Sequence, residues 1–170
     1  MKVGLVSDSH GHVRRLRQAL EELADLGAEA VVHCGDVGSP ECLAALGAAA
    51  PVALAVAGNM DRRVDRLAAA AERAGVTFST RHVELDLGCA GEGPSALVAT
   101  HGHDAHLLDA LVRGGQFAYV CHGHTHRRRD ERIGGARVIN PGALRHPRGG
   151  TRPSAALLDT VAEAVTWVEV

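Results

Sequence analysis

The sequence predicts a single α/β domain built on a parallel or mixed sheet. Its length of 170 residues fits one compact domain. Short apolar runs alternate three times with helical patterns over the first 75 residues, and such alternation is typical of parallel strands with helices packed outside them. From residue 76 onward the pattern changes to closely spaced strands. No linker or repeat separates the two parts, so we expect one domain over residues 1–170.

The first half of the chain pairs each predicted strand with a helix. Strands are predicted at 2–6, 28–33 and 51–57. The first helical pattern covers 11–26 and ends at Gly27. Ser39 and Pro40 predict the N-cap and first position of the second helix. An Ala-rich third helix ends at Gly75.

The second half is predicted to consist mainly of strands. These strands are expected at 76–79, 82–87, 95–100, 117–121, 129–133, 136–139, 154–159 and 162–170. A Gly-rich turn occupies 88–94, a short helix begins at about residue 106, and Gly134-Gly135 predicts a hairpin turn. The last two strands form a terminal hairpin, whose aliphatic side is a candidate surface for a homo-oligomer.

Composition excludes several classes of function. Apolar residues make up 46% of the chain, but aromatic residues only 2%, which disfavours base-stacking platforms. The net charge is −2 and Lys2 is the single lysine, so we expect neither an extended nucleic-acid surface nor a membrane surface. The four cysteines form no CxxC pair and no leader or membrane-spanning pattern is visible. These features predict a cytoplasmic protein.

Side chains suited to divalent cations follow five of the predicted strands. They are Asp8, His10, Asp36, Asn59, His101, His124 and His126. Ligands in α/β folds gather beyond the carboxyl ends of the strands, so these positions are expected to converge. Oxygen and imidazole donors together suit Mn²⁺, Fe, Zn²⁺, Co²⁺ or Ni²⁺. The sequence therefore predicts a metal centre that needs no thiolate.

The chain resembles the calcineurin-like metallophosphoesterases, and among them the small bacterial and archaeal phosphodiesterases. Its motifs occur in that family's order: Asp8-Ser9-His10-Gly11, Gly35-Asp36, Gly58-Asn59-Met60-Asp61, Thr100-His101-Gly102-His103, Gly123-His124-Thr125-His126 and Asn140-Pro141-Gly142. The resemblance implies a four-layer α/β/β/α sandwich with two mixed sheets. It also implies a hydrolase that acts on small phosphodiesters.

The same resemblance implies a role for each candidate ligand. One metal would be held by Asp8, His10 and His126, the other by Asn59, His101 and His124, with Asp36 as the bridge. Two divalent ions about 4 Å apart, Mn²⁺ being the expected metal, would activate a bridging hydroxide as nucleophile. Ser9 would then be structural rather than catalytic.

Neighbouring residues are candidates for further roles. Asn59, His101, His103 and Asp61 form the predicted catalytic set. His103 would reach a substrate oxygen or the leaving group, with an outer-shell role as the alternative. Asp61 would accept a hydrogen bond from a site histidine, or cap the following helix. His12 and His122 are expected to be ordinary histidines.

Two further features concern the rim of the site. The run Arg127-Arg128-Arg129 would either steer an anionic substrate or form a solvated loop, and Arg148 would lie at the rim. Met60 stands where larger phosphatases of the family have His and the small phosphodiesterases often have Cys. A thioether donates no proton, so Met60 argues against strong phosphomonoesterase chemistry.

Two competing interpretations remain. His101, His103, Asp104 and His106 resemble a metallo-β-lactamase signature, but the Asp is one residue out of register. A non-catalytic scaffold or partner-binding protein of the same fold, such as the retromer subunit related to these phosphodiesterases, is the second alternative. Loss of metal ligands would indicate a scaffold, whereas every ligand position of this chain carries a competent donor.

Overall fold

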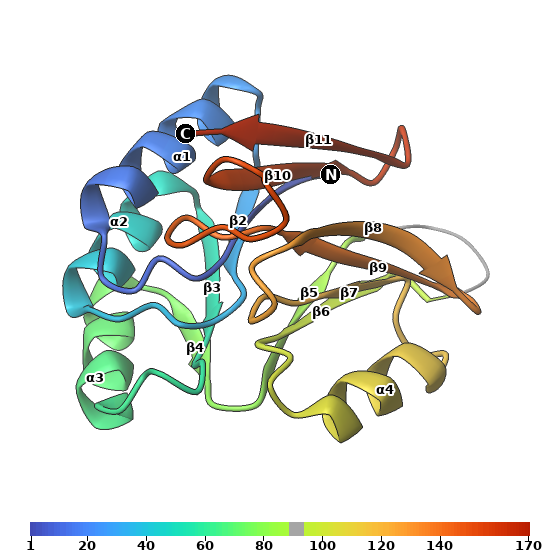
Figure 1. Cartoon of the computed structure of the whole chain (residues 1–170), viewed down its shortest axis with the longest axis horizontal. Helices are drawn as coiled ribbons and strands as arrows, with labels where there is room; N and C mark the ends of the chain where they lie inside the picture. The colour runs from blue at the N-terminus through green and yellow to red at the C-terminus, as the bar shows by residue number, and fades with distance from the viewer. Residues whose placement is uncertain (89–93) are drawn as a thin grey trace.

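Two β-sheets lie face to face in this protein, with helices on both outer sides (Figure 1). The structure is a computed structural model that describes residues 1–88 and 94–170, so most of the predicted turn at 88–94 lies outside the described residues. The helices are α1 (Val13–Asp25), α2 (Pro40–Ala49), α3 (Val64–Ala74) and α4 (Ala105–Arg113). The strands are β1 (Lys2–Val6), β2 (Ala30–His33), β3 (Val52–Val56), β4 (Thr77–Ser79), β5 (His82–Asp86), β6 (Ala96–Thr100), β7 (Tyr119–Cys121), β8 (Arg128–Ile133), β9 (Ala136–Pro141), β10 (Ser154–Asp159) and β11 (Ala164–Glu169).

Both sheets are mixed, as the resemblance implied. The first sheet has the strand order β11-β10-β1-β2-β3-β4, in which β1 to β4 run parallel and β10 is antiparallel to β1. The second sheet has the order β5-β6-β7-β9-β8, with a parallel centre and antiparallel edge strands. The terminal hairpin β10–β11 therefore returns to the first sheet and pairs with the first strand of the chain.

Three apolar clusters separate the layers. Leu16 and Leu43 belong to a cluster between α1, α2, α3 and the first sheet. Leu5 and Leu97 belong to the cluster between the two sheets, and Val112 to the cluster under α4. Burial of each large aliphatic side chain contributes roughly 1.5–3 kcal/mol. The predicted four-layer α/β/β/α sandwich with an aliphatic core is confirmed.

Helix ends follow local signals where the backbone allows it. Ser39 caps α2 by accepting a hydrogen bond from the Cys42 N–H, and α3 ends at Gly75 in the left-handed conformation with φ 69°. Both ends were predicted. The first helix is shorter than the predicted 11–26, because Gly11 has φ 77° and His12 is the N-cap. The backbone before α1 is shaped instead by the loop that carries Asp8 and His10.

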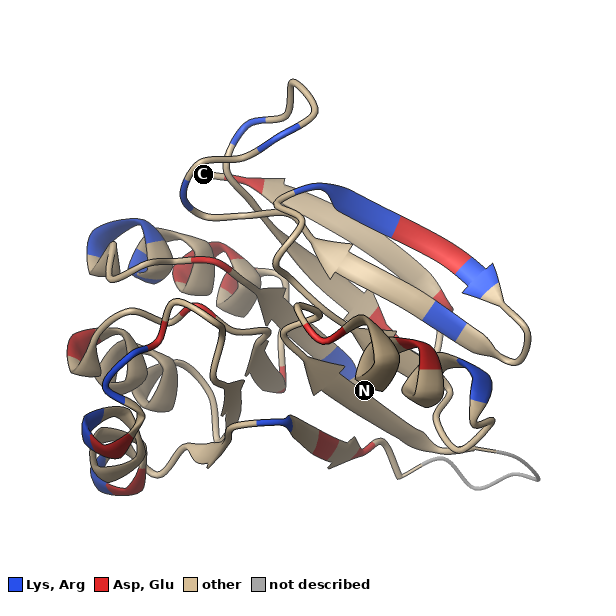
Figure 2. Cartoon of the chain, turned by 60° about the horizontal axis from the view of Figure 1, so that its bottom comes forward, with Lys and Arg blue, Asp and Glu red and all other residues tan. Residues whose placement is uncertain are grey.

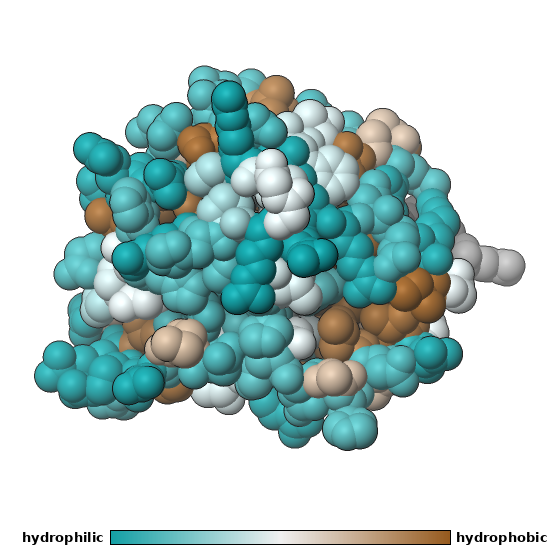
Figure 3. Space-filling model, viewed as in Figure 1, coloured by the Kyte–Doolittle hydropathy of each residue, from teal (hydrophilic) through white to brown (hydrophobic). Residues whose placement is uncertain are grey.

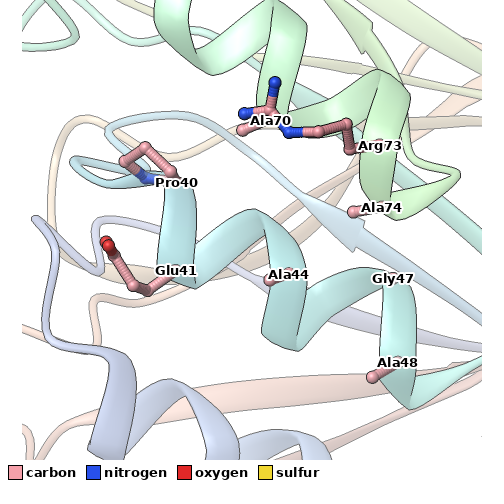
Figure 4. Close-up of a pocket in the computed structure, with 8 residues that line it drawn as sticks. All are labelled: Pro40, Glu41, Ala44, Gly47, Ala48, Ala70, Arg73 and Ala74. Atoms are coloured by element: carbon pink, nitrogen blue, oxygen red, sulfur yellow. The ribbon is translucent and has the colours of Figure 1, made fainter.

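The helical face of the first sheet is closely packed. A Cβ atom at Gly47 of α2 would lie 2.1 Å from the Ala74 carbonyl oxygen of α3. Beside this contact lies a groove of about 500 Å³ with walls of small residues, including Ala44 and Ala70 (Figure 4). None of the predicted metal ligands lines the groove.

The surface is predominantly polar. In the view of Figure 3 most of the surface is hydrophilic, with a hydrophobic patch on the side of α4. Along β8, basic residues are followed by acidic residues and then by a further basic residue (Figure 2). Among the described residues, no helix is both long and apolar enough to cross a bilayer.

Candidate metal centre

The predicted ligands converge where the two sheets meet. Asp8 and His10 follow β1, Asp36 follows β2 and Asn59 follows β3. His101 follows β6, while His124 and His126 follow β7. The strands β1, β2 and β3 are parallel to one another, and β6 is parallel to β7. Within each sheet, the residues that follow these strands therefore lie at the same edge. The loops meet near the centre of Figure 1.

One group of candidate ligands consists of Asp8, His10 and His126. Their ligand atoms lie within 4.8 Å of one another. His126 Nε2 is 3.1 Å from Asp8 Oδ1, and His10 Nε2 is 4.0 Å from the same oxygen. The predicted set for one metal is therefore brought together.

A second group joins Asp8, Asp36 and His101. Asp36 Oδ2 lies 3.4 Å from His101 Nε2 and 3.8 Å from His10 Nε2, so one oxygen faces histidines of both predicted metal positions. The Asn59 amide oxygen is 3.1 Å from His101 Nε2. This placement fits the predicted bridging position of Asp36.

His124 lies at the edge of the second group. Its ring centroid is 5.2 Å from that of His101, and its backbone N–H donates to Asp8 Oδ2 at 3.2 Å. Neither compact group includes the His124 ring. Its role as a ligand stays a prediction.

Each carboxylate at the centre has one anchored oxygen and one that faces histidines. Asp8 Oδ2 accepts hydrogen bonds from the Ser7 hydroxyl at 2.6 Å and from the His124 N–H, whereas Asp8 Oδ1 is buried without a hydrogen bond. Asp36 Oδ1 accepts from the Met60 N–H at 2.9 Å, which leaves Oδ2 toward His10 and His101. A buried oxygen without a donor is costly unless a cation binds it.

Two histidines direct a ring nitrogen at these oxygens. The His101 Nδ1–H donates to the Cys34 carbonyl at 2.9 Å, and the His126 Nδ1–H donates to the His146 carbonyl at 2.8 Å. A carbonyl only accepts, so in each neutral ring Nε2 carries a lone pair. Facing a carboxylate oxygen, that lone pair needs a proton or a metal ion between the two atoms. The donor set therefore fits divalent cations, and its outer partners fix the tautomers in the usual way.

The electrostatics of the centre agree with this geometry. Burial alone would lower the pKa of His101, but contacts with Asp36 and the Cys34 carbonyl outweigh it and raise the pKa. The neighbouring Asp8 carboxylate likewise raises the pKa of His126. Burial would raise the pKa of Asp36, yet His101 and the Met60 N–H lower it. Positive charge is thus favoured between these groups.

The other two histidines are kept neutral. Desolvation lowers the pKa of His10 despite the neighbouring Asp36 and Asp8 carboxylates. The pKa of His124 is also lowered, mainly by burial and by the nearby His101. Neutral imidazole is the form that ligates a metal.

The backbone at the centre is strained. Five candidate ligands have positive φ angles: Asp8 (54°), His10 (45°), Asp36 (54°), His124 (65°) and His126 (59°). Among the described non-glycine residues only two more do so, and one of them, His146, supplies the carbonyl to His126. Asp and His tolerate this region better than most residues, but each instance still costs of order 1 kcal/mol or more. Such clustering is typical of functional sites.

Glycines allow the loops to approach closely. A Cβ atom at Gly58 would lie 2.0 Å from Asp36 Oδ1, and one at Gly123 would lie 1.8 Å from Ser7 Oγ. At Gly35 a Cβ atom would meet the His101 ring at 2.4 Å. The glycines of the motifs thus make room for ligands and for the groups that anchor them.

Two residues beside the ligands have structural contacts. Ser9 is fully buried, and its hydroxyl contacts His33 Nε2 at 2.8 Å and the Val37 carbonyl at 3.0 Å, which fits the predicted structural role. Asp61 accepts backbone N–H groups from Val37 (3.0 Å), Gly38 (2.8 Å) and Gly58 (2.9 Å). The expectation that Asp61 caps α3 is wrong, because Arg63 occupies the N-cap position without a side-chain bond.

Other predicted neighbours divide between the centre and the surface. The His103 side chain is exposed, and its ring centroid lies 5.5 Å from that of His101. Its role in proton transfer stays a prediction. Asp104 caps α4 by accepting from the Leu107 N–H, and in the described residues no group of metal-ligating atoms includes His103, Asp104 or His106, which argues against the metallo-β-lactamase interpretation. Arg128 and Arg129 form ion pairs with Glu169 and Glu131, as a solvated strand would.

The histidines outside the predicted set have other surroundings. His122 is buried and contacts the Gly123 carbonyl and Arg129, and burial lowers its pKa to about 4. Neither His122 nor His12 belongs to a group of ligand atoms in the described residues. Arg148 is exposed, and its backbone N–H donates to the His126 carbonyl at 2.9 Å, which fits the predicted position at the rim.

Several supporting groups were not predicted. They are the Ser7 hydroxyl and the carbonyls of Cys34 and His146, which orient Asp8, His101 and His126. The buried Asn140 amide adds support, because it donates to the Gly123 carbonyl at 2.8 Å. Only Asn140 had a sequence signal, as part of a motif, since a backbone carbonyl carries no residue-type signature.

Comparison with known proteins gives consistent matches. Residues 1–163 match the family model of the calcineurin-like phosphoesterase superfamily domain. A phosphodiesterase of Methanocaldococcus jannaschii is 30% identical over 163 residues, covering 94% of this chain and 93% of the relative. The phosphodiesterase YfcE of Escherichia coli is 32% identical over 174 residues, covering 94% and 88%.

Solved structures show the same fold. The structure of an archaeal phosphodiesterase superposes with a TM-score of 0.86 at 27% identity and covers 100% of both chains. A Vps29 structure from Entamoeba histolytica has a TM-score of 0.63 at 18% identity, covering 100% of this chain and 98% of the other. The latter likeness concerns the fold alone.

Proposed function

This chain belongs to the calcineurin-like phosphoesterase superfamily, and from that premise we propose that it hydrolyses small phosphodiesters with two divalent cations. It is a metallophosphoesterase and therefore a hydrolase. The observation that carries the proposal concerns two carboxylates, each with one oxygen held by hydrogen bonds and the other facing a histidine. Asp36 faces the unprotonated Nε2 atom of His101, and Asp8 faces that of His126. The relatives named as phosphodiesterases support a diester as substrate.

Each residue would contribute to one of two adjacent cation positions. Asp8, His10 and His126 would hold the first, and Asn59, His101 and His124 the second. Asp36 would serve both, because its Oδ2 atom faces histidines of both sets. When bound, two such ions supply a nucleophilic hydroxide at neutral pH and neutralise charge on the phosphoryl oxygens.

The residues around the predicted ligands would orient the substrate and transfer protons, and none of them would act as the nucleophile. Ser9 is buried and hydrogen-bonded, so it is not available as a nucleophile. His103 is the exposed titratable side chain beside His101; it would contact a substrate oxygen or, as the alternative to the account based on Met60, protonate the leaving oxygen. Met60 is 53% exposed next to Asn59 but donates no proton. Diesters with stable leaving groups should therefore be the better substrates.

The proposal also includes the identity of the metal and the cellular location of the protein. We expect Mn²⁺ or a neighbouring transition metal, because mixed carboxylate, amide and imidazole donors suit these ions. We also expect residues 1–170 to act as one domain in the cytoplasm, free or as a homo-oligomer. The alternative, a non-catalytic scaffold, would be favoured by missing donors, whereas all seven predicted positions carry one.

Metal depletion tests the proposal directly. Chelator-stripped protein should not hydrolyse bis-(p-nitrophenyl) phosphate, and Mn²⁺ should restore turnover with about two ions bound per chain. Metal content is measured together with the rate, and circular dichroism monitors folding. Together these measurements distinguish loss of metal from loss of folding. Full metal binding without turnover on a panel of phosphodiesters would favour the scaffold instead.

A further inference from the structure

A cavity of about 350 Å³ lies beside the loop that follows Asn59, one of the predicted ligands. Its walls include Met60 and Leu67 as apolar side chains and Arg62, Arg63 and Arg66 as basic ones. We name it the arginine pocket. It lies where the chain passes from the β3 loop into α3, on the first-sheet side of the centre.

Met60 links the pocket to the metal centre. Its backbone N–H donates to Asp36 Oδ1 at 2.9 Å, and it directly follows Asn59 in the chain. Its side chain is 53% exposed and forms part of the pocket wall. A substrate held at the metal centre would therefore extend across Met60 into the pocket.

Basic side chains outnumber acidic ones in the pocket wall. In the part of the chain that the structure describes, Arg62 and Arg66 form no ion pair, and Arg63 has one long contact of 3.9 Å with the exposed Asp65. Asp61 also lines the pocket, but its carboxylate accepts three backbone N–H groups. Exposed pairs such as that of Arg63 are weak.

We propose that the arginine pocket binds a second phosphoryl group of the substrate. The substrate class would be phosphodiesters that carry a further phosphate on one ester arm. Guanidinium groups bind phosphate oxygens in pairs of parallel hydrogen bonds. The exposed Met60 side chain would contact the apolar parts of the sugar or base between the two phosphates. This inference rests on the proposed phosphodiesterase function and narrows its substrates.

Two substrates with the same leaving group test the proposal. The p-nitrophenyl ester of thymidine 5′-phosphate has one phosphate, and its 3′-phosphorylated counterpart has two. Wild-type protein with Mn²⁺ should prefer the second by about tenfold or more in kcat/KM, because charge-assisted contacts to phosphate are strong. The preference should weaken with added salt, since the arginines are exposed. A ratio near one would overturn the proposal.

Matched variants assign the effect to the pocket. The double variant R62Q/R66Q should bring the ratio close to one, while R73Q should keep the wild-type ratio. Arg73 is an exposed arginine of the same helix that lines the separate groove of Figure 4. A ratio that survives R62Q/R66Q, or falls equally in R73Q, would contradict the proposed site.

Binding without turnover separates this inference from the proposed function. By calorimetry, thymidine 3′,5′-bisphosphate should bind Mn²⁺-loaded protein at least about tenfold more tightly than thymidine 5′-phosphate, and R62Q/R66Q should remove the difference. If bis-(p-nitrophenyl) phosphate is not hydrolysed but this difference is found, the enzyme assignment fails and the pocket stands. If hydrolysis occurs and both probes bind equally, the pocket assignment fails alone.

Discussion

A single oxygen atom of Asp36 faces histidines of both predicted metal positions. Oδ1 is held by the Met60 N–H, so Oδ2 is free to face His10 at 3.8 Å and His101 at 3.4 Å. Asp8 is arranged in the same way, with Oδ2 anchored by Ser7 and Oδ1 without a hydrogen bond. The carboxylates are therefore preorganised before any cation arrives.

Replacement of Asp36 by Ala should be the most damaging single change. It removes the shared oxygen, so we expect turnover of bis-(p-nitrophenyl) phosphate to fall by more than about 100-fold, beyond the usual effect of losing an outer partner. Bound Mn²⁺, measured by elemental analysis, should fall as well. Asp65→Ala, at an exposed position of α3, is the matched control. Near-wild-type turnover in Asp36→Ala would contradict the two-metal assignment.

Met60 should limit the range of leaving groups. General acid catalysis contributes about 10²- to 10⁴-fold and matters least for stable leaving anions such as nitrophenolate. We therefore expect aryl diesters to be far better substrates than alkyl diesters. Met60→His should raise turnover of alkyl diesters and change aryl diesters little, as measured on a matched pair of substrates.

His103 is the competing source of the proton. Its ring lies beside those of His101 and His124, with centroid separations of 5.5 Å and 6.3 Å. If His103→Ala sharply raises the aryl-to-alkyl ratio and Met60→His leaves that ratio unchanged, His103 is the acid and the account based on Met60 is wrong.

At the scale of elements, the strand β9 supports the loop after β7. The buried Asn140 donates to the Gly123 carbonyl at 2.8 Å and to Thr125 Oγ1 at 3.1 Å, and accepts from the Gly142 N–H at 2.9 Å. These bonds fix the segment that presents His124 and His126. The Asn-Pro-Gly motif thus acts on the metal centre without contacting it through a ligand atom.

Asn140→Ala should weaken both the fold and metal binding. Each buried polar group left without a partner costs about 1–3 kcal/mol, so we expect a loss of a few kcal/mol in urea unfolding. Metal affinity should fall by about 10- to 100-fold, as for other outer partners. Asn140→Asp keeps the acceptor for Gly142 but sets an oxygen against the Gly123 carbonyl. It should be no more stable than Asn140→Ala, and wild-type stability in either variant would contradict this role.

Elements with strong local signals were predictable from sequence. The bounds of β1, the cap at Ser39 and the left-handed end at Gly75 follow from apolar spacing and residue type. The contacts of Asp61 were not predictable, because its three donors belong to loops up to 24 residues away. The carbonyl partners of His101 and His126 were equally hidden, since every residue has a carbonyl.

At the scale of the whole molecule, the candidate ligands come from both sheets. Asp8, His10, Asp36 and Asn59 follow strands of the first sheet, and the remaining three follow strands of the second. Their meeting depends on how the two sheets pack, which alternation alone did not reveal. The resemblance to a family supplied the four-layer arrangement. Bound cations would link the two sheets, so metal should stabilise the folded state.

Stability should fall in acid because His33 is buried in neutral form. Burial lowers its pKa to about 4 from an ordinary value of 6.5. The contribution of the neutral ring is therefore complete above about pH 6.5 and is lost as the pH falls toward 4. Between about pH 7 and pH 5 this loss should be about 2 kcal/mol, since one pKa unit corresponds to about 1.4 kcal/mol.

Urea unfolding of metal-free protein at both pH values measures this loss. His33→Gln should show a smaller pH dependence than wild type, while His106→Gln, at an exposed position, should retain the wild-type dependence. An unchanged pH dependence in His33→Gln would show that other groups cause the loss.

The left-handed backbone of five candidate ligands has a consequence for the evolution of such a protein. At Asp8, His10, Asp36, His124 and His126, glycine is the residue that relieves backbone strain, and asparagine is also well tolerated. Substitutions that favour the folded chain at these positions therefore tend to remove metal donors. Mutation under selection for stability alone would drift toward a well-folded protein without metal. Continued selection for metal-dependent chemistry is what retains the strained donors.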